Sequence, residues 1–282
     1  MKKWHLIIDV EKCEDCNNCL LACKDEHVEN VWPRYTQAQP RHGHRWIDIQ
    51  RKERGQYPLI DVAYRPTPCM NCDNAPCIKA GKGAVSKRAD GIVLIDPQKA
   101  QGHKALIEAC PYGAIWWNEE KQVAQKCTLC AHLLDQGWQQ PRCVQVCPTG
   151  ALRVEYVEDV QIGQIVEKEN LEVLHPEYQT SPSVYYKNMY RFDKCFIGGS
   201  VAVESKGVVD CAEGATVKLF RGIDKIAEVV TNEFGDFKID KITEDSGSYS
   251  LEITFERLSK SGVEVELGTS VNVGTILLSK HI

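Results

Sequence analysis

The amino-acid sequence lacks the features that mark several common classes of protein. It has no apolar run that approaches the roughly 20 residues of a membrane-spanning helix. It also lacks the glycine motifs that hold nucleotide phosphates, both G-x-G-x-x-G and the P-loop. No Ser/His/Asp or Cys/His catalytic set stands apart from its cysteine groups. The net charge of −5 argues against nucleic acid or an anionic membrane as the main partner.

The N-terminal segment also lacks the pattern of a secretory signal. Its short apolar run ends at Asp9, Glu11 and Lys12, and no small-residue cleavage site follows. We therefore expect residues 1–9 to form a first strand and the chain to be cytoplasmic, although a signal on a partner could export a folded complex. Without an oxidising compartment, a framework of disulfides is not expected.

Cysteine, in contrast, is abundant, with 14 in 282 residues. Twelve of them fall into four groups, and the spacing of the first group, C-x2-C-x2-C-x3-C, is the one that bacterial ferredoxins use to hold four-iron clusters. In chain order the groups are Cys13, Cys16, Cys19 and Cys23; then Cys69, Cys72 and Cys77; then Cys110 alone; and then Cys127, Cys130, Cys143 and Cys147.

The spacing dictates how these groups combine. Three cysteines in a tight loop wrap one face of a cubane, and the fourth is carried away by a helix to ligate a second cluster, so groups work in pairs. Pairing the first group with the fourth and the second with the third uses all twelve cysteines and completes three 4Fe–4S clusters. Pairing first with second and third with fourth leaves clusters short of ligands. The predicted ligands are Cys13, Cys16, Cys19 and Cys147 for cluster A; Cys127, Cys130, Cys143 and Cys23 for cluster B; and Cys69, Cys72, Cys77 and Cys110 for cluster C.

Four ligand positions of the same pattern carry other residues, namely Gly81, Ala100, His103 and Leu106. Under the same pairing, these four positions would have formed a single fourth cluster. Glycine, alanine and leucine cannot bind iron. An imidazole can, as in Rieske centres, but one ligand cannot hold a cubane. The sequence therefore predicts a lost cluster site that apolar side chains fill.

Zinc is the main alternative for the C-x2-C pairs at Cys69/Cys72 and Cys127/Cys130, because four thiolates suit a tetrahedral site. The third cysteine of C-x2-C-x2-C, the Cys-Pro endings and the completed pairing favour iron–sulfur clusters instead. Two cysteines lie outside the groups, Cys195 and Cys211, and we expect them to be small apolar residues without a metal.

Beyond the cysteines, several local stretches carry a family resemblance. They are Asp15-Cys16-Asn17-Asn18-Cys19, Gly43-His44-Arg45-Trp46, Arg65-Pro66-Thr67-Pro68-Cys69-Met70, Cys110-Pro111-Tyr112-Gly113-Ala114 and Tyr185-Tyr186-Lys187-Asn188. Together with the four ferredoxin-type groups, they resemble the iron–sulfur subunit of the dimethyl sulfoxide reductase family of molybdenum enzymes. The loss of one cluster and an added C-terminal β-domain are similar to a branch of aromatic hydroxytransferases within that family.

The resemblance implies an electron-transfer subunit with no catalytic residues of its own. Its partner would be a large subunit, in a heterodimer or a multiple of it, that binds molybdenum on two pterin guanine dinucleotides. The implied reaction is hydroxyl transfer between trihydroxybenzenes, of the pyrogallol-to-phloroglucinol type. Two alternatives stay open: the iron–sulfur subunit of a related molybdenum hydroxylase or reductase, acting on resorcinol or a catechol, and a free-standing polyferredoxin.

For the fold we expect an α+β protein in three parts. Residues 1–154 would form ferredoxin-like cluster modules, residues 155–195 a connecting and packing segment, and residues 196–282 an all-β domain. The last part loses the cysteines and shows period-two runs such as Ala215–Phe220 and Val263–Leu267, separated by turns that contain glycine. About seven short strands of this kind predict a prealbumin-like or immunoglobulin-like sandwich, or a barrel.

Three local expectations concern the rest of the chain. Residues 99–109 are expected to form the helix beside the lost cluster, and residues 160–174 another helix. The segment from Asn30 to Tyr64 is locally basic because of Arg41, Arg45, Arg51 and Arg54. These arginines form either a docking surface for a partner or an ordinary solvated face.

Overall fold

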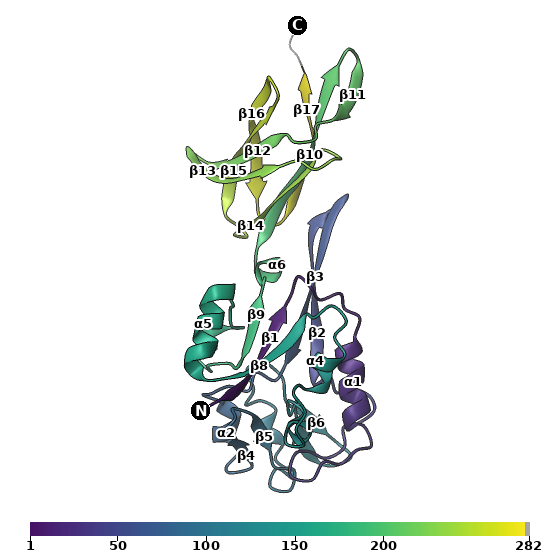
Figure 1. The fold of residues 1–282 in the computed structure, drawn as a ribbon, viewed down its shortest axis with the longest axis vertical. Coiled ribbons are helices and arrows are strands. Elements are labelled where there is room, and N and C mark those ends of the chain that lie inside the picture. The colour runs from purple at the N-terminus through teal and green to yellow at the C-terminus, as the bar shows by residue number, and fades with distance from the viewer. Residues whose placement is uncertain (280–282) are drawn as a thin grey trace. The chain divides into compact units, whose positions relative to one another are not determined.

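A computed structural model describes residues 1–279 of the chain (Figure 1). The chain divides into two compact units. Unit 1 consists of Met1–Arg51 and Tyr64–Met189, and unit 2 of Lys52–Ala63 and Tyr190–Ile282. The expected boundary between the connecting segment and the β-domain lay after residue 195, whereas unit 2 begins at Tyr190 and also takes in a segment from the first half of the chain.

Unit 1 contains short strands and short helices joined by long loops. Its strands and the hairpin that leads out of it are β1 Lys3–Asp9, β2 Ile47–Gln56, β3 Leu59–Pro68, β4 Val85–Lys87, β5 Val93–Ile95, β6 Trp116–Asn118, β7 Val123–Gln125, β8 Leu152–Val157 and β9 Val184–Lys187. Its helices are α1 Asn18–His27, α2 Pro76–Ala80, α3 Ala131–Leu134, α4 Arg142–Gln145 and α5 Asp159–Glu169, with 3-10 turns η1 Lys104–Leu106 and η2 Pro176–Tyr178.

A three-stranded sheet organises unit 1, with strand order β8-β1-β9. Strand β1 is central: it pairs antiparallel with β8 and parallel with β9. A central strand is covered on both faces, and Leu6, Ile7 and Ile8 are accordingly all buried. Ile7 packs against Ile162 of α5 and Leu171, which fixes that helix on one face of the sheet. The remaining strands form three two-stranded hairpins, β2-β3, β4-β5 and β6-β7.

The helix expected beside the predicted lost cluster site is not present in the structure. Residues 99–109 do not form a helix; the segment makes separate turns around η1. Glycine at position 102 adopts a positive φ of 73°, which a continuous right-handed helix does not accommodate. The second helix expected, over 160–174, appears as α5 at Asp159–Glu169, where Asn170 ends it in the left-handed conformation.

Unit 2 is built almost entirely of strands. After the short helix α6 Tyr190–Asp193 come β10 Cys195–Ser205, β11 Val208–Cys211, β12 Thr216–Arg221, β13 Asp224–Val230, β14 Asp236–Ile242, β15 Gly247–Phe255, β16 Leu258–Leu267 and β17 Val271–Ser279. They form two four-stranded sheets. In one, β10 pairs with β11, β14 and β17; in the other the order is β13-β12-β15-β16. The described strands do not close into a barrel.

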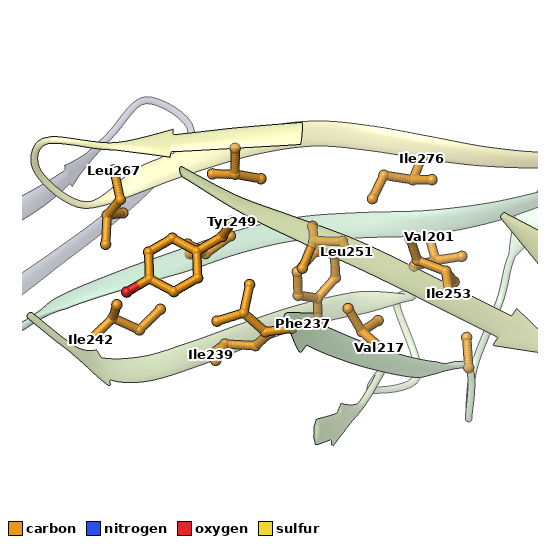
Figure 2. Close-up of a cluster of buried hydrophobic side chains, with 14 of the residues drawn as sticks. Val201, Val217, Phe237, Ile239, Ile242, Tyr249, Leu251, Ile253, Leu267 and Ile276 are labelled. Atoms are coloured by element: carbon orange, nitrogen blue, oxygen red, sulfur yellow. The ribbon is translucent and has the colours of Figure 1, made fainter. Parts of the chain in front are cut away.

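One apolar core joins the two sheets of unit 2. Alternate residues point inward along strands such as β12, β14 and β15, as the period-two runs predicted. Figure 2 shows the cluster, in which Val217, Leu251 and Ile253 come from one sheet and Val201, Phe237 and Ile276 from the other. The sulfur-bearing side chain of Cys195 lies in this core and is buried, while Cys211 is exposed, so neither belongs to a cysteine group.

Arg54, near the tip of the β2-β3 hairpin, fits neither of the two interpretations of the basic segment, a docking surface or a solvated face. Its side chain is only 2% exposed and lies within unit 2, so it is neither a solvated residue nor a docking residue. The guanidinium donates to both carboxylate oxygens of Asp240 at 2.9 Å, to Asp61 and to the carbonyl oxygen of Lys194. Two carboxylates compensate the buried charge, and these bonds account for the hairpin tip belonging to unit 2.

Candidate metal centres

The four cysteines predicted for cluster C line one cavity. Cys69 and Cys72 come from the loop after β3, Cys77 from α2, and Cys110 from the turn after η1. The rest of the wall is largely apolar, with Met70, Ala75, Pro76, Val93 and Ile115. Two further polar residues line this cavity, Tyr112 and Lys126. The fold thus brings together thiols that lie up to 41 positions apart in the sequence, between Cys69 and Cys110.

The four cysteines predicted for cluster B line a second cavity. Cys127, Cys130 and Cys143 come from the fourth group, and Cys23 reaches them from α1 of the first group. Leu6, Trp46, Ile47 and Leu129 supply apolar walls, with His27 and Arg142 at the same cavity. The first and fourth groups therefore meet in space, as their pairing requires.

The four cysteines predicted for cluster A form a third, more open set. Cys19 is buried, Cys13 and Cys147 are half-buried, and Cys16 is exposed. Burial raises the pKa of Cys19, and the charges of Cys13, Cys16 and Cys147 raise it further, so these three sulfurs lie near Cys19. The hydroxyl of Thr149 lies 3.8 Å from the Cys147 sulfur. This set contrasts with sets B and C in its access to solvent.

The first C-x2-C loop of the first, second and fourth groups turns in the same way. The residue before the second cysteine of that loop is left-handed in all three groups, with φ of 53° at Asp15, 46° at Asn71 and 50° at Leu129. The left-handed conformation is energetically unfavourable for leucine. A turn of this kind points successive N–H groups to one side, as in the concave backbone sites that bind anions and iron–sulfur clusters. In the fourth-group loop the N–H of Leu129 donates to the sulfur of Cys127 at 3.4 Å. Outside these loops, the N–H of Ala114 donates to the sulfur of Cys110, also at 3.4 Å.

Burial raises the pKa of most of these thiols. It raises the pKa of Cys19, Cys72 and Cys130 to about 12 each and that of Cys77 to about 11. A metal ligand must be a thiolate, so an empty site of this kind would hold neutral thiols at pH 7 and release protons when metal binds. The arrangement suits a cationic centre that supplies the missing positive charge.

Three of the four positions of the predicted lost site are buried in the protein. Ala100 and Leu106 are fully buried, and Gly81 directly follows α2, which lies beside η1. A methyl group on Gly81 would lie 2.5 Å from Val85 Cγ2, so Val85 occupies the space beside that position. The turn at Gly102, two residues after Ala100, keeps the left-handed conformation of the three cysteine loops. His103 precedes η1 and is only half-buried.

Sequence reasoning missed two groups of residues at these centres. Lys126 is buried against set C, although its position directly before Cys127 marks it as part of the loop. The Tyr112 hydroxyl lies 2.6 Å from the hydroxyl of Thr180, and a hydrogen bond from Thr180 lowers the pKa of Cys72, which burial otherwise raises. Thr180 lies 108 positions from Cys72, so no local pattern reveals it.

No three Cys, His, Asp or Glu side chains within residues 1–279 lie close enough together for one metal ion. A cubane asks for wider spacing, because each thiolate binds its own iron. No helix in the same part of the chain is long and apolar enough to cross a membrane.

Comparison with known proteins decides the family. Residues 60–157 match a family model described as a 4Fe-4S dicluster domain. The chain is 49% identical to the pyrogallol hydroxytransferase small subunit of Pelobacter acidigallici, over 99% of this chain and 100% of that protein. This chain belongs to the iron–sulfur subunits of the dimethyl sulfoxide reductase family of molybdenum enzymes.

Other members of the family match a smaller share of the chain. A tetrathionate reductase subunit of Salmonella typhimurium is 33% identical over 65% of this chain and 72% of its own length. An iron–sulfur subunit of the dimethyl sulfoxide reductase type from Halobacterium salinarum is 31% identical over 67% of this chain and 80% of its own length. As a member of this family, the chain carries iron–sulfur clusters and serves in electron transfer.

Proposed function

We propose that the chain holds three 4Fe–4S clusters. Cluster A would be held by Cys13, Cys16, Cys19 and Cys147, cluster B by Cys127, Cys130, Cys143 and Cys23, and cluster C by Cys69, Cys72, Cys77 and Cys110. The main support is that sets B and C each line a single cavity. In set A, Cys13, Cys16 and Cys147 lie near enough to Cys19 to influence its pKa, which burial raises most. The filled positions at Gly81, Ala100 and Leu106 support the number three rather than four.

We place set B between sets A and C, because it has connections to both. Sets A and B share helix α1, where Cys19 and Cys23 are one turn apart, and share the segment from Cys143 to Cys147. Sets B and C meet at Cys127, whose sulfur accepts a hydrogen bond from the backbone N–H of Cys69.

The protein side of the mechanism consists of holding, polarising and shielding the thiolates. Cubane clusters bound in this way accept and release single electrons with little rearrangement, at potentials set by charge, hydrogen bonds to sulfur and exposure. The N–H groups of Leu129 and Ala114 stabilise the negative sulfurs of Cys127 and Cys110. The apolar walls of cavities B and C exclude water, whereas the exposed Cys16 leaves set A open to solvent.

We further propose that this subunit serves a molybdenum hydroxytransferase that converts pyrogallol to phloroglucinol. The catalytic site would lie on a large partner subunit, with molybdenum on two pterin guanine dinucleotides. The support is similarity over the full length of the hydroxytransferase subunit, whereas the reductase subunits match about two thirds of this chain. The reaction has no net redox change, so the clusters would adjust the oxidation state of the metal rather than feed turnover.

A reductase or hydroxylase that passes net electrons is the second candidate, favoured by the reductase subunits among the relatives. A free-standing polyferredoxin would not need a large partner. Unit 2 we regard as a two-sheet sandwich that stabilises the complex, and unit 1 as the ferredoxin-like part. The cytoplasmic location stays a prediction.

The test is isolation of the complex from its native cell, followed by metal analysis and assay. We expect a large molybdenum-containing partner, about 12 iron and 12 sulfide per copy of this chain, and turnover of pyrogallol without an external electron acceptor. About 16 iron would contradict the lost site. A strict need for an acceptor would favour the reductase, and a molybdenum-free monomer would favour the polyferredoxin.

A further inference from the structure

Lys126 is a buried cation at the junction of two cysteine sets. It immediately precedes Cys127 of set B and lines the cavity of set C. Lys126 is only 3% exposed to solvent. Burying an ammonium costs several kcal/mol unless negative groups compensate it, so a buried lysine needs an identifiable partner.

The partners of Lys126 are carbonyl and sulfur atoms. Its ammonium donates to the carbonyl oxygen of Val93, on β5, and to that of Cys127 at 3.0 Å. A further hydrogen bond joins it to Cys69, of set C. None of these hydrogen-bond partners of the Lys126 ammonium, within the described residues, is a carboxylate. Two carbonyl oxygens and the sulfurs of the cavity that it lines are therefore the described groups that can compensate this charge.

The position of Lys126 relates it to both sets. It is directly bonded to Cys127 of set B, and it lines the cavity that Cys69 and Cys77 of set C also line. Its ammonium is held there by the carbonyl oxygens of Val93 and Cys127.

We propose that the Lys126 ammonium is a positive charge shared by clusters B and C, and that it raises the reduction potentials of both. The inference rests on the proposed ligand sets. Each reduction adds one negative charge to a cluster. A nearby fixed positive charge in a low-dielectric interior favours that addition, because the Coulomb interaction is weakly screened there. In this proposal Lys126 acts on the clusters through its charge and is not a catalytic residue.

Two other lysines near the clusters provide matched controls. Lys24 follows Cys23, interacts electrostatically with that sulfur and donates to the carbonyl oxygen of Pro40 at 2.8 Å, so it bears on set B alone. Lys87 donates to the carbonyl oxygens of Asn71 and Cys72 at 3.0 Å each, but Asp73 neutralises it at 2.7 Å. Removal of Lys24, which lies next to one set, or of Lys87, which is already paired with Asp73, should therefore change the reduction potentials differently from removal of Lys126.

The experiment is a redox titration, monitored by electron paramagnetic resonance, of the purified complex carrying Lys126→Met. We expect the potentials of B and C to become more negative and that of A to stay unchanged. Lys24→Met should shift B alone, Lys87→Met should shift C less than Lys126→Met does, and Lys126→Arg should restore both potentials toward the wild type. Unchanged potentials of B and C in the fully loaded Lys126→Met protein would overturn the inference, and so would an equal shift of A.

Iron and sulfide analysis separates this inference from the function on which it rests. A wild-type complex without three four-iron clusters contradicts the ligand sets, whatever Lys126 does. If Lys126→Met fails to load its clusters, the Lys24→Met/Lys87→Met protein labelled with ε-¹⁵N-lysine, in which the other lysines described beside sets B and C are removed, provides a second measurement. A ¹⁵N coupling on the reduced signals of both B and C supports the shared charge, and its absence from either signal contradicts it.

Discussion

The two units of this chain are stabilised in different ways. Unit 2 buries alternate apolar side chains from both sheets in one core, with Leu219 and Ile253 fully buried. Unit 1 has short elements, and its interior is divided by two cavities lined with cysteine. An apolar core needs no ligand, whereas buried thiols around a cavity gain their stability when metal binds. One chain thus combines a unit whose core needs no ligand with a unit whose stability depends on bound metal.

The filled site is the exception within unit 1. At Gly81, Ala100 and Leu106 the chain keeps the turn of a cysteine loop but packs it with apolar side chains, as unit 2 does. Under the proposed loss of a cluster, these side chains would take up space that would otherwise be a void, and a void destabilises in proportion to its volume.

Removing iron should produce the largest effect and the clearest contrast. With a chelator under reducing conditions, we expect unit 1 to lose the slow amide hydrogen exchange of β1 and β8, while β12 and β15 of unit 2 keep theirs. Folding and metal binding are one equilibrium where the site does not exist without metal. Hydrogen exchange with mass spectrometry measures both units in one sample. Full protection of β1 in the iron-free chain would contradict the comparison.

Replacing one proposed ligand should remove a third of the metal. Cys110→Ser is expected to lower iron from about 12 to about 8 per chain, because set C loses a thiolate while A and B keep theirs. Iron analysis and electron paramagnetic resonance would check this. Cys211→Ser, at an exposed cysteine of unit 2, is the matched control and should change neither. Loss of the A signal with C intact would show that the pairing is wrong.

Much of the site could be predicted because its information is local. Ligand spacing within a loop, as in Cys13 to Cys19, follows from the geometry of a cubane, and the Gly81 gap could be counted from it. Lys126 and Thr180 could not be predicted as neighbours of set C, because their contacts depend on long-range packing. The same limit explains Arg54: its partner Asp240 lies 186 positions away and its burial leaves no periodic signal.

In the fold, the alternation in residues 196–279 identified strands, and the structure has eight of them from β10 to β17 rather than about seven. Which strands pair was not predictable, since period two shows only which face is buried. The helix expected at residues 99–109, beside the proposed lost cluster, is absent because Gly102 adopts a left-handed turn like those of the cysteine loops.

Arg54→Met tests whether unit 2 depends on its buried ion pairs as well as on its core. We expect a loss of about 3 kcal/mol in the free energy of unfolding of unit 2, because Asp240 and Asp61 lose a buried partner. The loss lies at the low end of the range for buried pairs, since Arg191 and Lys238 still face Asp61. Denaturant-dependent hydrogen exchange of β14 measures it. Glu228→Gln, which breaks the exposed pair with Lys225, is the control and should cost at most about 1 kcal/mol.

The same network predicts a pH dependence for unit 2. Burial raises the pKa of Asp61, but hydrogen bonds from Arg54, Arg191 and Lys238 outweigh it and hold the pKa below its usual value. A carboxyl whose pKa is depressed by folding contributes stability above about pH 4, and that stability is lost as the pH falls toward the folded pKa. Arg54→Met should flatten this acid-dependent loss; an identical pH profile in the variant would assign it to other carboxyls.

Leu106→Ala should reopen the filled site. We expect unit 1 to lose about 2–5 kcal/mol of stability with no change in iron content, because a fully buried side chain is removed and alanine binds no metal. Chemical denaturation of the loaded protein and iron analysis provide the two readouts. Leu106→Met keeps most of the volume and should cost less than about 1.5 kcal/mol. Equal effects of the two substitutions would mean that Leu106 does not fill a void.

Gly81→Ala makes the smallest and most specific test of how tightly the lost site is packed. The φ of −73° at Gly81 suits any residue, so a cost can arise only from the new methyl group, which would meet Val85 Cγ2 at 2.5 Å and the Cys77 carbonyl oxygen at 3.0 Å. We expect a loss of about 1–3 kcal/mol from overpacking. Gly163→Ala in α5, where no atom lies within 4 Å of the added methyl group, should instead stabilise unit 1 by about 0.5–1 kcal/mol.

A double-mutant cycle with Val85→Ala shows whether Val85 is the cause. If the two side chains compete for the same space, Gly81→Ala should cost less in the Val85→Ala background, with a coupling of about 0.5 kcal/mol or more. Additive effects would locate the clash at the Cys77 carbonyl, which cannot move without disturbing a proposed ligand of cluster C. In that case Gly81→Ala should also alter the resonance signal of C, and the filled and retained sites would prove to be mechanically linked through α2.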